Sequence, residues 1–245
     1  MTFAYPGADT PVVKGIDFVS GPGETTAIIG RTGCGKSSVV KLIPRLYDTL
    51  FGEVLVDGVN VKDYKLDELR DLIGYVPQKN VLFTGDIASN LNFGNKGGCE
   101  EDWREATRIA CADEFVEKKD GTYHSVVAQG GTNFSGGQRQ RLAIARAVMK
   151  RPEIYIFDDS FSALDMKTDR TLRQNLKENM GDATMIVVAQ RVNTIMDATR
   201  ILVLEDGEVV GMGTHRELLS SCRLYREIAE IQLGEEEVKH ELARA

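Results

Sequence analysis

A glycine-rich segment that ends in a lysine and two serines is the part of this sequence best suited to chemistry. It fits the pattern Gly-x4-Gly-Lys-[Ser/Thr] and lies between a strand pattern at 25–29 and a helix pattern at 36–43. Glycines let the backbone curl so that successive N–H groups point at phosphate oxygens, and the following helix adds its positive end. The Lys36 ammonium can then reach the β- and γ-phosphates, and the Ser37 hydroxyl can coordinate Mg²⁺. The segment therefore predicts a phosphate-binding loop made of Gly30, Arg31, Thr32, Gly33, Cys34, Gly35, Lys36, Ser37 and Ser38.

A second candidate group is the carboxylate of Asp158. It ends the mainly apolar run 153–157, which has the pattern of a buried strand. Such a carboxylate can hold Mg²⁺ beside the serine of a phosphate loop. An apolar strand that ends in Asp is common, so the prediction depends on the presence of the loop.

A third segment, residues 133–141, precedes a helical pattern. Locally it is a capping box in which Ser135 caps the helix and Gln138 reaches back. A Ser-Gly-Gly sequence at a helix start also exposes a hydroxyl and bare N–H groups, which makes a second anion site. One chain would then present two phosphate-binding surfaces.

These residues need elements that bring strand ends together. Short apolar strand patterns alternate with helical patterns along the chain, which predicts an α/β fold with a mostly parallel sheet. Two segments, 52–61 and 201–210, read as antiparallel hairpins, the first with Asp57-Gly58 at its turn. Residues 86–150 are predominantly helical, with helices expected over 100–119 and 135–150 and no strand between them. Residues 222–245 form an expected helical tail that breaks at Gly234.

The composition is that of an ordinary globular chain. Of 245 residues, 42% are hydrophobic and 27% are charged, which argues against collagen, coiled coils and wholesale disorder. The longest strictly apolar run covers residues 185–189, whereas a membrane-spanning helix needs about 20 residues. The net charge of −7 disfavours nucleic acid as a partner. The cysteines have no CxxC spacing, which favours reduced thiols over disulfides or a zinc site: Cys34, Cys99, Cys111 and Cys222.

With these motifs in this order, the sequence resembles the ATP-binding cassette (ABC) ATPases, specifically the nucleotide-binding domain of ABC exporters, over nearly its whole length. Residues 30–38 match the Walker A motif and 154–158 the Walker B motif. Residues 134–138 match the Leu-Ser-Gly-Gly-Gln signature, with Phe134 in place of Leu. The further matches are the aromatic A-loop at 3–6, the Q-loop at 76–78 and the D-loop at 162–165.

The resemblance implies a fold, ligands and partners. The fold is a P-loop NTPase (RecA-like) core with an antiparallel β subdomain and an inserted helical subdomain, in one ATP-binding domain over 1–245. Its ligands are ATP and Mg²⁺. Its partners are a second nucleotide-binding domain, packed head to tail, and a transmembrane domain, with no nucleic acid. Its place is the cytoplasmic face of a membrane.

The resemblance also assigns roles to individual residues. Tyr5 stacks on adenine, although a surface aromatic near a Pro-Gly turn explains it nearly as well from the sequence alone. Mg²⁺ is held by Ser37, Gln78 and Asp158. The signature residues that contact the partner's ATP are Ser135, Gly136, Gly137 and Gln138, and the D-loop residue is Asp165.

Two catalytic positions depart from the family pattern. The residue after Asp158 is Asp159, where the family has a Glu that polarises the attacking water, and Gln190 stands where the family has a switch histidine. A carboxylate that falls about 1 Å short of the water can lower the rate roughly 10²-fold. A glutamine can donate an N–H to the γ-phosphate but cannot carry a proton or a charge. Upstream of the signature, Ala128 and Gln129 replace a Gly and a Glu of the family's X-loop.

We therefore expect Lys36, Asp159 and Gln190 to form a site that binds ATP and hydrolyses it slowly, as in one subunit of a heterodimeric exporter. Its intact signature would complete the competent site of the partner. A small backbone shift that lets Asp159 act as a full base is the alternative for that residue. Two other functions stay open: a nucleotide-sensing module without catalysis, and a soluble ABC ATPase that acts on nucleic acid or ribosomes.

Overall fold

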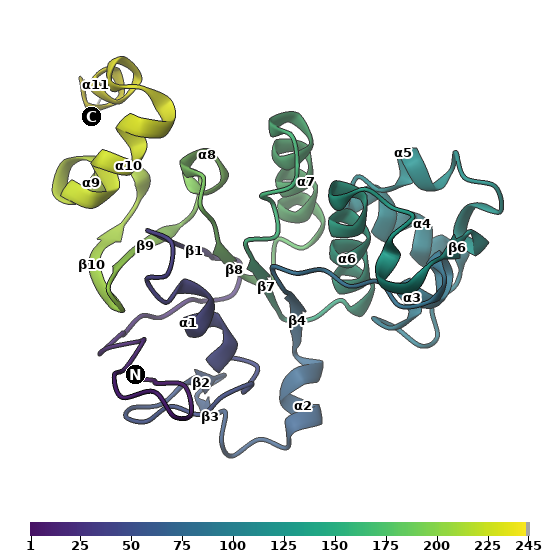
Figure 1. Ribbon diagram of the computed structural model, residues 1–245, viewed down its shortest axis with the longest axis horizontal. Coiled ribbons are helices and arrows are strands. Elements are labelled where there is room, and N and C mark those ends of the chain that lie inside the picture. The colour runs from purple at the N-terminus through teal and green to yellow at the C-terminus, as the bar shows by residue number, and fades with distance from the viewer. Residues whose placement is uncertain (244–245) are drawn as a thin grey trace. The chain divides into compact units, whose positions relative to one another are not determined.

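The computed structural model describes residues 1–243, which fall into two compact units. The first unit comprises Met1–Ile73 and the segment from Thr184 onward, and the second comprises Gly74–Ala183. Figure 1 labels the elements of both. The last two residues of the tail predicted at 222–245 lie outside the described residues. No helix within residues 1–243 is both long enough and apolar enough to span a bilayer.

A mainly parallel set of strands forms the core of the first unit. The strand order is β10-β9-β1-β8. Strand β1 pairs in parallel with both β8 and β9, whereas β9 and β10 form an antiparallel hairpin. The interior residues of β1 and β9 are fully buried, as is typical of strands covered on both faces. The strands are β1 (Thr25–Gly30), β8 (Thr184–Val188), β9 (Arg200–Glu205) and β10 (Glu208–Gly213).

Short elements complete this part of the first unit. The predicted hairpin at 52–61 is confirmed as β2 and β3, whose turn residues Asp57 and Gly58 have φ of 49° and 77°. Two left-handed residues in a two-residue turn match the twist of the flanking strands. The elements are α1 (Lys36–Leu42), β2 (Leu55–Val56), β3 (Val59–Asn60), α2 (Leu66–Asp71) and α8 (Val192–Ile195).

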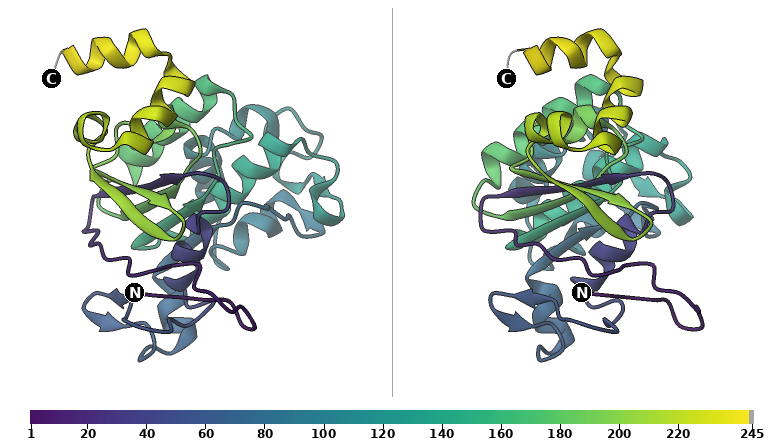
Figure 2. Two further views of the ribbon diagram at one scale, coloured as in Figure 1. Left: turned by 60° about the vertical axis from the view of Figure 1, so that its left-hand side comes forward. Right: turned by 90° about the vertical axis from the view of Figure 1, so that its left-hand side faces the viewer.

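Three helices end the described chain: α9 (His215–Ser221), α10 (Arg223–Leu233) and α11 (Glu235–Ala243). The buried ring of His215 joins them, because its Nδ1 lies 2.6 Å from Tyr225 Oη and its Nε2 lies 2.7 Å from Glu241 Oε2. The break between α10 and α11 falls at Gly234, as predicted, where φ is 98°. Within this unit, α11 lies at the opposite end from the β2–β3 hairpin (Figure 2).

The second unit contains the neighbouring strands β4 and β7 and a group of helices. Helix α6 is the longest and packs against α3 and α4. On the inner face of α3, the side chains of Ile87 and Leu91 are fully buried. The main elements are β4 (Ile73–Val76), α3 (Ile87–Asn92), α4 (Glu100–Ile109), α5 (Asp113–Val116), α6 (Gly136–Lys150), β7 (Ile154–Asp158) and α7 (Met166–Asn179).

Two details of this unit differ from the sequence-based expectation. The predicted helix at 100–119 is two helices, because Cys111 adopts a left-handed φ of 53°. The segment 86–150 also contains β6, which pairs with β5, although strands of two residues are too short to show a periodic pattern. These short elements are β5 (Gly85–Asp86), β6 (Val126–Val127) and the 3₁₀ turns η1 (Thr122–His124) and η2 (Gln129–Gly131).

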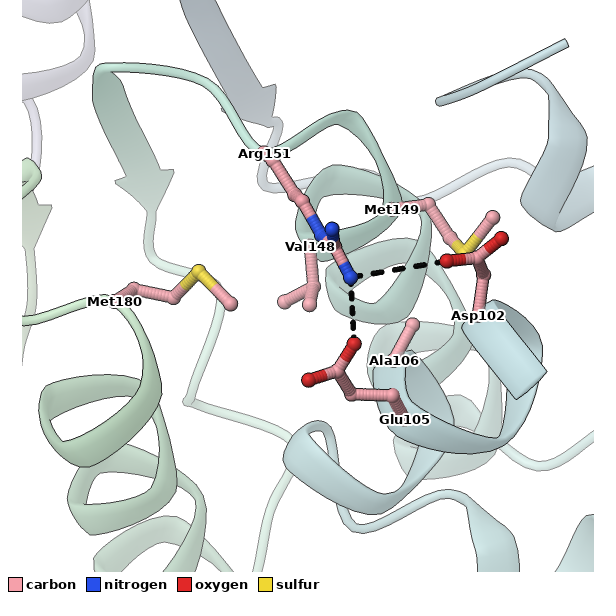
Figure 3. Close-up of a pocket in the computed structure, with 7 residues that line it drawn as sticks. All are labelled: Asp102, Glu105, Ala106, Val148, Met149, Arg151 and Met180. Carbon is pink, nitrogen blue, oxygen red and sulfur yellow. Dashed lines mark hydrogen bonds and ion pairs between the residues drawn. The ribbon is translucent and has the colours of Figure 1, made fainter. Parts of the chain in front are cut away.

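A small pocket in the second unit is lined in part by ion-paired side chains. Figure 3 shows the Arg151 side chain pointing between two carboxylates of α4. Its Nη2 lies 2.7 Å from Glu105 Oε2 and 3.7 Å from Asp102 Oδ1. Val148, Met149 and other apolar groups line the rest of the pocket. This contact links the C-terminal end of α6 to α4, and none of the predicted site residues takes part in it.

Candidate functional site

The predicted phosphate loop connects β1 to α1 in the first unit. Gly30 ends β1, and Gly33 and Gly35 follow with left-handed φ of 85° and 99°. A Cβ on Gly30 would lie 2.1 Å from Leu204 O, and a Cβ on Gly35 would lie 2.6 Å from Val12 O. The backbone therefore passes so close to its neighbours at these two positions that only glycine fits.

The Lys36 side chain folds back over this loop. Its Nζ donates hydrogen bonds of 2.9 Å to Gly30 O and 2.9 Å to Arg31 O, and it lies 3.8 Å from Cys34 Sγ. The side chain is 8% exposed. A buried ammonium is stable only with such partners, and the carbonyls of Gly30 and Arg31 supply them. Ser37 and Ser38 follow in the first turn of α1.

Tyr5 lies beside the start of α1. Its Oη is 3.0 Å from Ser38 Oγ. Its ring contacts Phe3 and Tyr47 edge-on, with centroids 4.9 and 5.0 Å away. The structure thus brings the predicted A-loop tyrosine to the phosphate loop, although these two residues are 33 positions apart in the sequence.

Gln190 lies at the same edge of the sheet as the phosphate loop. It follows β8, which runs parallel to β1, and the N–H of Ala189 donates to Ile28 O over 3.1 Å. The Gln190 side chain is exposed, and its backbone carbonyl accepts a hydrogen bond of 2.7 Å from Gln232 Nε2. Because parallel strands end at one edge, the loop and Gln190 lie at the same edge of the sheet, and Tyr5 joins them through its contact with Ser38.

In the second unit, two adjacent carboxylates follow β7. Asp158 is 2% exposed and Asp159 is 7% exposed. Tyr75 Oη donates to Asp158 Oδ2 over 3.1 Å, and Gln78 Nε2 donates to Asp159 Oδ2 over 3.2 Å. The structure therefore brings Gln78, Asp158 and Asp159 together, and it adds Tyr75, which the sequence analysis missed because an ordinary strand aromatic carries no distinguishing signal.

The backbone of Asp159 is left-handed, with φ of 52°. Such a conformation costs a non-glycine residue roughly 1–3 kcal/mol unless its surroundings hold it. Two side chains do so through its carbonyl: Ser162 Oγ donates over 2.9 Å and Gln140 Nε2 over 3.4 Å. Gln140, which is buried, also accepts from Ala163 N over 3.3 Å. The sequence analysis missed Gln140 because it reads as one more polar residue on a helix.

The signature segment forms the capping box that its sequence predicts. Ser135 Oγ accepts from Gln138 N over 3.2 Å, and Gln138 Oε1 accepts from Ser135 N over 3.0 Å. Phe134 is buried, whereas Ser135 and Gly136 are exposed. The helix end thus presents its hydroxyl and first N–H groups to the outside. Upstream, Ala128 N donates to Asn133 Oδ1 over 3.1 Å, which fixes the loop that leads to the signature.

The D-loop lies against the signature helix. A Cβ on Gly137 would be 3.3 Å from Ala163 O, so glycine allows the close approach. Asp165 caps α7 and accepts hydrogen bonds from Thr168 N and Thr168 Oγ1, at 3.0 and 2.7 Å. The Thr168 N–H, followed by its hydroxyl, lowers the pKa of Asp165 below its ordinary value. The carboxylate is therefore ionised at neutral pH, at the positive end of a helix.

Comparison with known proteins gives this arrangement a family. The chain belongs to the ABC transporter family, whose sequence profile matches residues 13–162. It is 52% identical over 236 residues to an uncharacterized ABC transporter ATP-binding protein of Mycobacterium tuberculosis. This match covers 94% of this chain and 40% of that protein. The chain is 39% identical to an ATP-dependent lipid A-core flippase of Photobacterium profundum, with 96% and 40% covered.

A solved structure of a bacterial Atm1-family ABC exporter with ATP bound superposes with a TM-score of 0.89 at 34% identity, covering 93% of this chain and 40% of that one. The fold class predicted from the sequence, that of an exporter nucleotide-binding domain with a P-loop NTPase core, is confirmed. The chain spans about two fifths of the length of the relatives it matches.

The glycines of the phosphate loop give a matched stability test. We expect Gly30→Ala to lower the free energy of unfolding by about 3 kcal/mol, because the new methyl group collides with backbone that cannot move. Gly33 also has a positive φ, 85° against 156° at Gly30, but open space within 4 Å of its Cβ position. Gly33→Ala should therefore cost only about 1–2 kcal/mol of strain. Urea unfolding of both variants measures the difference, and equal losses would contradict the close packing at Gly30.

Proposed function

We propose that this chain is the ATP-binding domain of an ABC exporter, forms one domain over residues 1–245, and binds Mg·ATP to drive export through separate transmembrane segments. The observation that carries the proposal is the loop of residues 30–38, which buries the Lys36 ammonium against its own carbonyls. The flippase and exporter relatives support the export direction. The Ser37 hydroxyl and the Asp158 carboxylate are oxygen donors of the kind that Mg²⁺ prefers, which supports the choice of this cation.

The residues we assign to the nucleotide divide by the unit that contains them. In the first unit, Tyr5 stacks on adenine, the loop binds phosphates and Ser37 supplies a hydroxyl for Mg²⁺. In the second unit, Asp158 and Gln78 supply further oxygens. The cation, when bound, neutralises charge that develops on the phosphates. The place of this chain in the cell would be the cytoplasmic face of a membrane.

We infer that the chain's own site turns over slowly. The Asp159 carboxylate is bound to Gln78 and its backbone is fixed by Ser162 and Gln140. These contacts oppose the backbone shift that would let a shorter side chain replace the glutamate of the family. Gln190 offers a neutral N–H donor in place of a histidine. The same two residues support the second candidate function, a nucleotide sensor without catalysis.

We further propose that the signature serves a second nucleotide-binding domain, packed head to tail, so that this chain is one half of a heterodimer. The exposed Ser135 and Gly136 support this, because a helix start that faces outward is available to a partner's phosphates. The signature sequence is nearly that of the family, in contrast to the catalytic positions. An intact signature beside a weakened catalytic site is the pattern expected of a subunit that assists its partner's reaction.

The transmembrane partner also has a candidate contact surface in the second unit. The loop after Gln78 exposes Val81 and Phe83, at 55% and 44%, and Phe83 stacks on the 65% exposed Phe93 with centroids 4.4 Å apart. Arg146 covers the Phe83 ring at 4.9 Å. A cluster of exposed apolar side chains such as this one is a candidate interaction surface. We propose that the transmembrane domain docks on this surface.

Restoring both family residues tests the slow site. We expect the double variant Asp159→Glu/Gln190→His to hydrolyse ATP about 10²-fold faster than the unchanged chain, because the general base regains its reach. The measurement is steady-state phosphate release at saturating Mg·ATP. Asp159→Ala is the control and should change turnover and ATP affinity less than threefold. Fast turnover of the unchanged chain that Asp159→Ala abolishes would contradict the proposal.

Complementation in trans tests the head-to-tail assembly. Adding Ser135→Arg to the double variant should abolish its fast turnover, because the bulky side chain closes the signature, and should leave Mg·ATP affinity within twofold. Mixing this triple variant with the unchanged chain, whose signature is intact, should recover fast turnover. The readouts are phosphate release and equilibrium binding of Mg·ATP. Loss of ATP binding in the triple variant, or no recovery on mixing, would argue that the signature acts within its own chain.

A further inference from the structure

A side chain from the C-terminal helix α10 clamps the segment that carries Gln190. Gln232 Nε2 donates to Gln190 O over 2.7 Å, and Gln232 Oε1 accepts from Val192 N over 2.8 Å. One amide therefore binds both sides of Arg191. Two hydrogen bonds of this kind fix the direction in which the backbone leaves β8 at Gln190.

The clamp belongs to helix α10, which is packed against the rest of the first unit. The inner face of α10 is buried through Leu224, Tyr225 and Ala229, which are 7%, 0% and 0% exposed. Tyr225 Oη is held 2.6 Å from His215 Nδ1. On the other side of the clamp, Val192 is fully buried. Because both partners are anchored, the amide of Gln232 joins two fixed parts of the same unit.

Helix α10 also approaches the phosphate loop. Glu227 Oε2 lies 3.7 Å from Arg31 Nη2, with side chains 40% and 66% exposed. A pair as exposed as this contributes little to stability. It shows that the helix that holds the Gln190 backbone lies beside the loop that we propose to hold the phosphates.

We propose that Gln232 is a positioning residue that directs Gln190 toward the terminal phosphate of bound ATP and thereby sets the preference of the site for ATP over ADP. The proposal rests on the proposed function, in which Gln190 donates to the γ-phosphate. ADP lacks that phosphate, so its binding does not depend on Gln190 or on Gln232.

The experiment measures dissociation constants for Mg·ATP and Mg·ADP with the full 245-residue chain and its variants. Gln232→Ala should reduce the ATP-over-ADP preference three- to tenfold with unchanged ADP affinity, as expected for the loss of one or two hydrogen bonds. Gln232→Glu keeps the acceptor for Val192 N but loses the donor to Gln190 O, and should reduce the preference as well. The matched control is Ile231→Ala, the 85% exposed neighbour, which should change neither constant.

A double-mutant cycle separates the possible outcomes. Gln190→Ala should reduce the preference by a similar factor, and adding Gln232→Ala should reduce it no further, because the second residue acts through the first. Equal losses for ATP and ADP in Gln232→Ala would show a structural role and overturn the inference, as would no loss at all. If Gln190→Ala itself leaves the preference unchanged, the proposed role of Gln190 fails and the inference fails with it.

Discussion

The parallel pairing of β1 with β8 is the constraint on which the first unit's candidate site depends. Parallel strands end at one edge, so the loop after β1 and the segment after β8 must emerge side by side. Gly30 and Gly35 make this possible, because the backbone at both positions passes within contact of neighbouring carbonyls. The sheet therefore places the loop that carries Lys36 beside Gln190, although the two residues are far apart along the chain, and Tyr5 reaches the loop through Ser38.

In the second unit, a network of polar side chains around the end of β7 holds Asp159 in place. Gln78 binds the carboxylate, while Gln140 and Ser162 bind the carbonyl of the same left-handed residue. Such a network favours one geometry over its alternatives. A glutamate at this position would meet the same backbone with a longer reach. The aspartate therefore shortens the reach of the carboxylate, whereas the hydrogen bonds of Gln140 and Ser162 hold only the backbone carbonyl.

The sequence predicted the features that are local or strongly patterned. The buried strands, the glycine-rich loop between β1 and α1 and the capping box at Ser135 follow from apolar runs, glycine spacing and Ser-x-x-Gln, and the structure contains all three. The break at Cys111 and the strand at Val126–Val127 are too short to leave a periodic signal. The contacts of Tyr75, Gln140 and Gln232 depend on tertiary packing, for example over 42 residues between Gln190 and Gln232, and no local pattern marks them.

Binding of a triphosphate by the loop of residues 30–38 is the property on which the proposed function depends. The most direct measurement is a crystal structure of the chain with Mg²⁺ and a non-hydrolysable ATP analogue. The account predicts that the Lys36 ammonium leaves the carbonyls of Gly30 and Arg31 for the β- and γ-phosphate oxygens, and that Ser37 coordinates the cation. A structure in which Lys36 stays folded on its own loop while the triphosphate binds elsewhere would contradict it.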